Sequence, residues 1–310
     1  MTTVLITHPA CLEHDTGDWH PECADRLRHV LRALEGEAFA DLLRERAPQA
    51  TVEQLQRVHP ADYVEAILAI RPEPGDHVPL DADTLMSAGS AEAALRSAGG
   101  AIMAVDAVME GWAKHAFVAT RPPGHHAERA RAMGFCFFAN AAIAARHAQA
   151  HWNLGKVAIV DFDVHHGNGT QAIFNADPSV FYGSSHQYPC YPGTGAPEET
   201  GTNGNVMNVP LRPGSDGSAF RAAWERELIP ALDAFAPELL IVSAGFDAHK
   251  ADPLAQLRVE TADFAWLTAR LLDVARKHCA GRLVSLLEGG YDLDALAASA
   301  AAHVRTLLQD

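Results

Sequence analysis

Short apolar runs recur along the chain, and a polar cluster that contains histidine, glycine or a carboxylate follows each of them. The runs lie at 4–6, 116–119, 157–160, 180–182, 239–242 and 283–287. Runs of this kind, without polar alternation, are typical of strands buried on both faces of a parallel sheet. Segments with helical spacing separate them, at 22–34, 87–110, 140–152, 217–234, 261–278 and 292–308. The alternation predicts a three-layer α/β/α fold with a mostly parallel central sheet.

The chain shows no composition shift that would mark a linker, so we expect its 310 residues to form a single catalytic domain over 1–310. Two stretches rich in Gly and Pro, 71–76 and 187–217, are predicted to be loops over the functional site. Open parallel sheets bind ligands at the carboxyl ends of their strands. We therefore expect the polar clusters to meet along that edge and to build one active site.

Composition narrows the class of protein. The net charge is −15, from 24 basic and 39 acidic residues, which argues against binding to a nucleic-acid backbone. The 5 cysteines lack paired spacing and are predicted to be reduced thiols. No signal-length or membrane-spanning apolar segment is visible. We expect a cytoplasmic enzyme without membrane or direct nucleic-acid contact, with homo-oligomer formation left open.

The segment Asp161–Gly169 has the sequence DFDVHHGNG and directly follows an apolar run. Asp163 and His165 are two residues apart, so in extended backbone their side chains point the same way. Carboxylate and imidazole groups are ligands that Zn²⁺ accepts, and a catalytic zinc has three protein ligands with one open position. The segment therefore predicts half of a metal site, and the third ligand must come from another loop.

Several motifs in the same order resemble those of the zinc-dependent histone deacetylase superfamily. The resemblance is strongest to its class II branch and to bacterial histone deacetylase-like amidohydrolases, which are related to acetylpolyamine amidohydrolases. The motifs cover nearly the whole chain and are found at 20–22, 121–127, 134–138, 161–169, 192–195, 244–247, 252–253 and 288–291.

The resemblance implies a set of metal ligands. Asp163, His165 and Asp252 match the zinc ligands of the family, with one Zn²⁺ expected per chain. Asp161 and Ser184 match residues that hold a structural K⁺ ion, and hard oxygen ligands suit such an ion.

The resemblance also implies the catalytic residues. His125 and His126 match the tandem histidines beside the metal-bound water, and Tyr291 matches the tyrosine that faces the substrate carbonyl. Asp161 matches the carboxylate that pairs with the first histidine. Asn168 lies where the second histidine finds its partner, and Asn at this position marks the class II branch, since the wider family has Asp.

The predicted substrate contacts lie along a narrow channel. Phe135 and Tyr191 match two aromatic walls of the family's acyl-lysine channel, and Tyr191 replaces a more usual Phe. Gly134 precedes the first wall, and Leu254 stands where a polyamine-selective relative would have Glu. The sequence therefore favours acetyl-lysine in a peptide or protein as substrate, with an acetylated polyamine as the alternative.

Amide hydrolysis itself demands these groups, because water is a weak nucleophile and an amine anion cannot depart. A bound zinc lowers the pKa of water from 15.7 to about 7 and polarises the carbonyl. His126 is the predicted base and acid, and neutral Asn168 is expected to leave it with a lower pKa than Asp would. Two other functions stay open: a binuclear manganese ureohydrolase, which Asn168 disfavours, and an inactive acyl-lysine binding module, which an intact Tyr291 disfavours.

Overall fold

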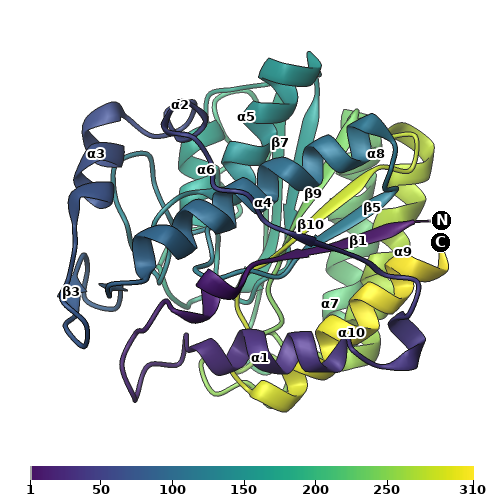
Figure 1. Cartoon of the computed structure of the whole chain (residues 1–310). Helices are drawn as coiled ribbons and strands as arrows, with labels where there is room; N and C mark the ends of the chain where they lie inside the picture. Colours follow the sequence, from purple (N-terminus) through teal and green to yellow (C-terminus); the bar gives the residue numbers. More distant parts are fainter. Residues whose placement is uncertain (1) are drawn as a thin grey trace.

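A computed structural model describes residues 2–310 and contains one eight-stranded sheet (Figure 1). Its order is β2-β1-β5-β10-β9-β6-β7-β8, and every neighbouring pair is parallel. The strands are β1 (Thr3–Thr7), β2 (Leu43–Arg46), β5 (His115–Val118), β6 (Val157–Asp161), β7 (Val180–Gln187), β8 (Val206–Leu211), β9 (Leu239–Ala244) and β10 (Leu283–Leu287). A small antiparallel hairpin pairs β3 (Val78–Pro79) with β4 (Leu85–Met86). The predicted single α/β domain with a parallel central sheet is confirmed.

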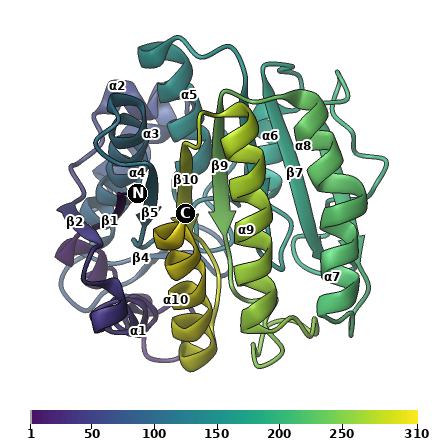
Figure 2. The same cartoon turned by 90° about the vertical axis from the view of Figure 1, so that its right-hand side faces the viewer.

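Helices cover both faces of the sheet (Figure 2). On one face α4 (Ser90–Glu110) packs against α5 (Asn140–Trp152), with α2 (Val52–Leu55) and α3 (Ala61–Ala69) at its border. On the other face α10 (Leu293–Gln309) lies between α1 (Ala24–Ala33) and α9 (Thr261–His278), and α8 (Ile229–Phe235) follows α9. Short α6 (Asn168–Phe174) and α7 (Gly217–Ala223) flank the strands on the β7 side.

Alternate strand residues feed two separate hydrophobic cores. Val4 and Ile6 of β1 join the core under α4 and α5, whereas Leu5 joins the core under α9 and α10. This division follows from the two-residue repeat of a strand, which points successive side chains to opposite faces. Both faces of the sheet are therefore buried against helices, which explains why the strand segments are apolar without polar alternation.

The two edge strands of the sheet, β2 and β8, were not predicted from the sequence. The predicted loop 187–217 contains β8, which pairs only with β7, and β2 pairs only with β1. The residues of β2, Leu43-Arg44-Glu45-Arg46, are all exposed, so an edge strand here carries charge instead of an apolar run. The expected helix 217–234 is interrupted by a π-helical turn at Trp224–Leu228. Edge strands and wider helical turns leave little trace in hydrophobic periodicity, which explains these differences.

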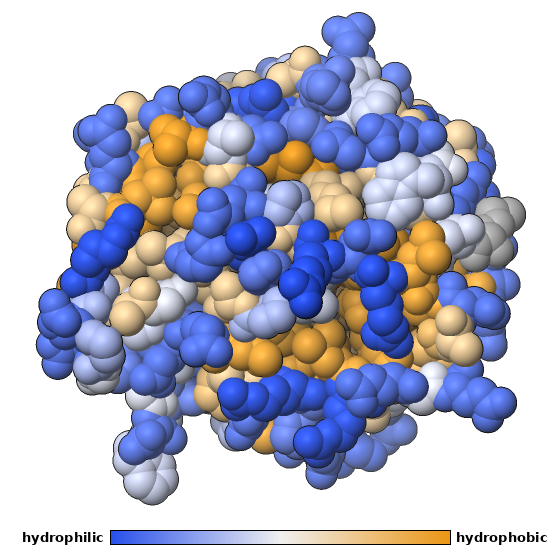
Figure 3. Space-filling view, in the orientation of Figure 1, coloured by the Kyte–Doolittle hydropathy of each residue, from blue (hydrophilic) through white to orange (hydrophobic). Residues whose placement is uncertain are grey.

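Among residues 2–310, no helix is both long enough and apolar enough to cross a bilayer. Polar and charged side chains cover most of the face seen in Figure 3, with apolar patches between them.

Candidate metal and active site

Loops after three adjacent strands meet at the carboxyl edge of the sheet. β10, β9 and β6 are neighbours, so the residues after them converge: Glu288–Tyr291, Gly245–Asp247 and Phe162–Gly167. Glycine permits this convergence at two places. A Cβ at Gly245 would collide with the Asp163 carboxylate, and one at Gly289 would collide with the carboxylates of Asp163 and Asp247.

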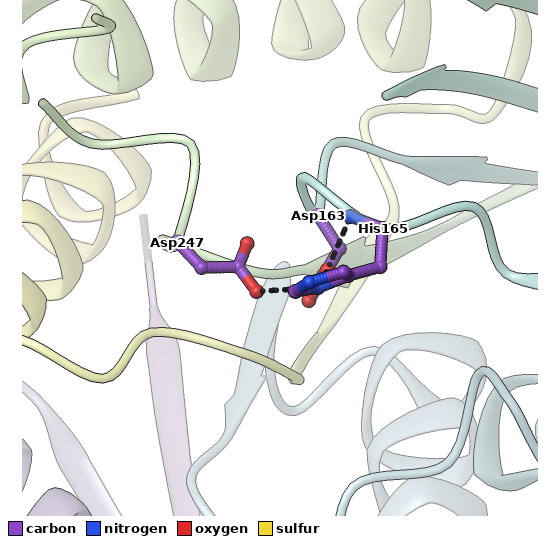
Figure 4. Close-up of side chains that lie close together, drawn as sticks. All are labelled: Asp163, His165 and Asp247. Atoms are coloured by element: carbon purple, nitrogen blue, oxygen red, sulfur yellow. Dashed lines mark hydrogen bonds and ion pairs between the residues drawn. The ribbon is translucent and has the colours of Figure 1, made fainter. Parts of the chain in front are cut away.

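A possible metal-binding group consists of Asp163, His165 and Asp247, each of them buried (Figure 4). Nδ1 of His165 lies 3.1 Å from Oδ1 of Asp163 and 3.1 Å from Oδ2 of Asp247. The backbone N–H of Gly289 donates to Oδ2 of Asp163 over 2.8 Å and fixes that carboxylate. Two carboxylates and one imidazole form a donor set that fits a divalent metal ion.

Asp252, the predicted third ligand, is not part of this group, in which Asp247 lies beside His165. The Asp252 carboxylate accepts hydrogen bonds from the backbone N–H of Leu254 (3.0 Å) and of Tyr291 (2.7 Å). Burial raises the pKa of Asp252, while the charge of His165 opposes that shift. Its role as a ligand stays a prediction. Sequence reasoning placed Asp247 at the end of a strand but assigned it no role.

The buried carboxylates support a cation at this point. Burial, together with the charge of Asp163, raises the pKa of Asp247 to about 7, and burial raises the pKa of Glu288 to about 7. Burial also raises the pKa of Asp161. Burial thus disfavours the ionised forms of these three carboxylates, whereas His125 and His165 overcome burial at Asp163 and hold its pKa below the usual value. A divalent cation between Asp163, His165 and Asp247 would stabilise the ionised forms.

The tandem histidines have different partners, as the resemblance implies. His125 Nδ1 lies 3.0 Å from Oδ2 of Asp161, and His126 Nδ1 lies 2.8 Å from Oδ1 of Asn168. The Asn168 amide is held in turn by Glu128, whose Oε1 accepts from Nδ2 at 2.8 Å. Because the amide oxygen only accepts, His126 carries its hydrogen on Nδ1 and keeps a lone pair on Nε2.

The two partners separate the pKa values of the histidines. Burial opposes a charge on His125, but the carboxylates of Asp163 and Asp161 overcome it and raise the pKa of His125 to about 10. Burial, reinforced by the charges of His125 and His165, lowers the pKa of His126 well below its usual value. Burial is the main cause and the Asn168 hydrogen bond acts in the opposite sense, so the lower pKa expected from Asn168 in place of Asp stays a prediction. A neutral base thus lies beside a charged histidine.

A cavity of about 210 Å³ leads from the surface to this group and brings all the predicted substrate-contacting residues together. It is lined by Asp83, His126, Gly134, Phe135, His165, Tyr191, Leu254 and Tyr291. Its aromatic walls pack closely, with ring centroids 5.1 Å apart for His126 and Tyr191 and 5.9 Å apart for Phe135 and Tyr291. Gly134 has φ 56°, and a Cβ there would collide with the His126 ring.

A buried ion network holds the Tyr291 loop from below. Arg26 donates from Nε to the carbonyl of Gly290 (2.5 Å) and from Nη2 to the carbonyl of Glu288 (2.5 Å). Its third bond goes to Glu22 (2.9 Å), which Arg121 also binds through two nitrogens at 2.5 and 2.6 Å. The guanidinium lies 4.8 Å from the centre of the Tyr291 ring. Sequence reasoning missed Arg26, because one arginine in a helix carries no local sign of a contact 264 residues away.

The two predicted potassium ligands lie side by side. Asp161 of β6 and Ser184 of β7 are register partners. Oγ of Ser184 lies 2.9 Å from Nδ1 of His186, and Oδ1 of Asp161 accepts from the backbone N–H of Asp163 at 3.1 Å. Potassium binding here stays a prediction.

Buried metal-ligating groups at the carboxyl edge of a parallel sheet, with a neutral base and a narrow channel, are typical of α/β metallohydrolases. Comparison with known proteins gives the family. The histone deacetylase domain model matches residues 20–307. The chain therefore belongs to the histone deacetylase family, as a deacetylase or amidohydrolase of that family.

The similar proteins span bacteria, archaea and plants. A histone deacetylase-like amidohydrolase of Pseudomonas aeruginosa is 42% identical over 296 residues, which cover 91% of this chain and 77% of that protein. A probable deacetylase of Archaeoglobus fulgidus is 36% identical over 300 residues, covering 95% of this chain and 82% of that protein. The crystal structure of the HDA15 HD domain superposes with a TM-score of 0.93 at 37% identity, covering 100% of this chain and 88% of that chain.

Proposed function

We propose that this chain is a zinc-dependent deacylase that hydrolyses the amide of N-acetyl-lysine side chains and releases acetate. The carrying observation is that four features meet at one point: the Asp163–His165–Asp247 group, the His126–Asn168 pair, Tyr291, and the inner end of a narrow channel. Activation of water, polarisation of the carbonyl and protonation of the leaving amine would each then have a side chain or a metal position close by. The proposal takes zinc as the ion because carboxylate and imidazole ligands suit it.

The residues of the chain divide the work. When bound, the metal supplies an activated water and polarises the substrate carbonyl. Neutral His126 accepts a proton at Nε2, because its Nδ1 hydrogen is held by Asn168, and it returns that proton to the leaving amine. His125, whose Nδ1 lies 3.0 Å from Oδ2 of Asp161, lies beside His126 and in its protonated form would contribute positive charge as negative charge develops on the carbonyl oxygen.

Tyr291 is the proposed hydrogen-bond donor to that oxygen. In residues 2–310 its hydroxyl has no protein hydrogen-bond partner, so it is free to donate to a ligand in the cavity that it lines. Burial raises the pKa of Tyr291 well above its usual value, which keeps the hydroxyl protonated at neutral pH.

The channel supports a linear acyl-amine substrate. Aromatic rings on its sides suit the methylene stem of lysine, and apolar Leu254 adds no charge at its lining. An acetylated polyamine is the second candidate, and the Asp83 carboxylate on the same lining favours it by attraction to a distal ammonium group. The two candidates share the chemistry at the metal and differ only in what lies outside the channel.

Turnover of a fluorogenic acetyl-lysine peptide is compared with that of N-acetylputrescine, using protein that carries one zinc per chain. Cleavage of the peptide, with a loss of about 10²- to 10³-fold in the Tyr291→Phe variant, supports the proposal. Preference for N-acetylputrescine makes the chain a polyamine deacetylase. Absence of cleavage of both substrates by the zinc-loaded protein refutes the proposal.

A further inference from the structure

Trp19 is the most exposed large apolar side chain in residues 2–310, at 97% of its surface. A single exposed apolar side chain needs no explanation by itself. Tryptophan, however, is the residue whose burial contributes most often to binding energy at interfaces. The exposure of Trp19 suggests a binding role only if the residue lies near the active site.

Trp19 lies beside the mouth of the channel. The next residue, His20, packs its ring edge-on against Phe135, with centroids 4.7 Å apart, and its Nε2 lies 3.0 Å from the backbone oxygen of Asp83. Phe135 and Asp83 both line the channel. The side chain of His20 therefore ties the loop that carries Trp19 to two residues of the channel lining.

The loop that carries Trp19 is ordered by its own hydrogen bonds. The backbone N–H of Asp15 donates to Oγ of Ser87 (2.9 Å), and the Thr16 hydroxyl donates to the carbonyl of Glu22 (2.5 Å). Gly17 has φ 90°, and its carbonyl accepts from the N–H of His20 (3.3 Å) to close a turn. Trp19 stands in this turn. An ordered turn presents the indole with little further entropy to lose on binding.

This loop projects from the body of the molecule. In Figure 1 the segment before α1 extends outward below β3, and a group of atoms stands out from the same corner in Figure 3. A substrate chain that leaves the channel on this side would pass over the loop.

The loop is also acidic. Glu13, Asp15 and Asp18 are all exposed, and residues 13–19 contain no Lys or Arg, only the buried His14. The exposed Arg131 is engaged by Asp81 at 2.9 Å, and Nε2 of His77 lies 3.3 Å from the Asp15 carboxylate. The surface beside Trp19 still carries an excess of acidic side chains, within a chain of net charge −15. Such a surface attracts cations, and a tryptophan face binds a guanidinium or ammonium group directly.

We propose that the loop 13–20 is a docking surface for the segment that flanks acyl-lysine in a peptide or protein substrate, and that it selects a basic side chain there. Trp19 covers the basic side chain with its indole face, while Asp18 and its neighbours supply the attraction. This inference deepens the proposed function, on which it rests for the acyl-lysine held in the channel. A small free acyl-amine cannot reach both the channel floor and Trp19, so the surface favours peptides.

The test compares two peptides, each with a central acetyl-lysine, flanked in one by arginines and in the other by glutamates. Capped N-acetyl-lysine methylamide serves as the substrate too small to reach Trp19. The variants are Trp19→Ala, Trp19→Phe and Asp18→Asn. Trp112→Ala is the matched control, because Trp112 is also exposed (37%) but precedes β5 at the other end of the sheet.

We expect Trp19→Ala to raise KM for the arginine-flanked peptide about tenfold, the loss typical of an interface anchor, with kcat unchanged. Trp19→Phe should retain most of the affinity. Asp18→Asn should narrow the preference for arginine over glutamate flanks. Turnover of the methylamide should be the same in all variants, and Trp112→Ala should behave as the wild type on every substrate.

Peptide affinity measured by calorimetry in the Tyr291→Phe background separates this inference from the proposed function. If the protein with Tyr291 intact hydrolyses neither peptide, but Trp19→Ala weakens binding of the arginine-flanked peptide, the docking surface stands and the deacylase proposal fails. If the peptide does not bind, or binds equally with and without Trp19, the docking surface is refuted. A Trp19→Ala defect that is as large on the methylamide as on the peptide also refutes it.

Discussion

Replacing Arg26 by Met should destabilise the protein and slow its catalysis together. Met keeps most of the side-chain stem but removes three hydrogen bonds: to Gly290, Glu288 and Glu22. Glu22 stays ionised because Arg121 still binds it through two nitrogens. The main loss is therefore the pair of hydrogen bonds to the buried carbonyl oxygens of Gly290 and Glu288. A hydrogen bond with a charged donor contributes about 1.5–3 kcal/mol. We expect a loss of about 4 kcal/mol, or roughly 6 °C in Tm for a chain of this length.

The same change removes the support of the Tyr291 loop. The guanidinium stacks on the Tyr291 ring and holds the carbonyl of the preceding residue. A displacement of the hydroxyl by about 1 Å would cost roughly 10- to 100-fold in kcat. Differential scanning calorimetry and steady-state kinetics on the acetyl-lysine peptide measure the two effects.

Arg28→Met is the matched control on the same helix. Arg28 is exposed and pairs only with the exposed Asp25, so its loss should cost at most about 0.5 kcal/mol. If Arg26→Met lowers Tm no more than Arg28→Met does, the buried network contributes no net stability and the reasoning is wrong. If Tm falls but kcat is unchanged, the network stabilises the fold without positioning Tyr291.

Three further changes test the site and the core. Asp163→Asn should weaken the affinity for zinc by more than the roughly 10- to 100-fold lost when a residue that only hydrogen-bonds to a ligand is replaced. Zinc affinity is measured by competition with a chelator, and an unchanged affinity would exclude Asp163 as a ligand. Asn168→Asp should raise the pKa of His126, because a carboxylate stabilises the protonated imidazole, so the acid limb of the pH–rate profile should move to higher pH; an unmoved limb would exclude His126 as the base. His303 is buried, which lowers its pKa from 6.5 to about 3. The unfolded chain then binds a proton that the folded chain refuses, so stability should fall as pH drops below 6.5, by about 2 kcal/mol at pH 5. His303→Gln should weaken this pH dependence of the denaturation midpoint, and an equal dependence in both proteins would contradict it.

The parallel strands and the site loops could be predicted because their signals are local. A strand buried on both faces must be apolar throughout, so β6, β9 and β10 are visible as uninterrupted runs. The exposed edge strand β2 and the partly polar β8 lack that requirement and were missed. The channel residues Phe135, Tyr191 and Leu254 were identified by resemblance to a family, since nothing in their local sequence shows that they line one cavity.

The chemical groups of the site follow from residue type and spacing: carboxylates and imidazoles after apolar strands, and glycines where carboxylates crowd the backbone. Which of these groups come into contact depends on the folded chain. Folding placed Asp247 beside His165, brought Arg26 beneath the Tyr291 loop, and left Trp19 in water at the channel mouth. Each of these outcomes depends on contacts between segments distant in sequence, and no local pattern encodes the geometry of such contacts.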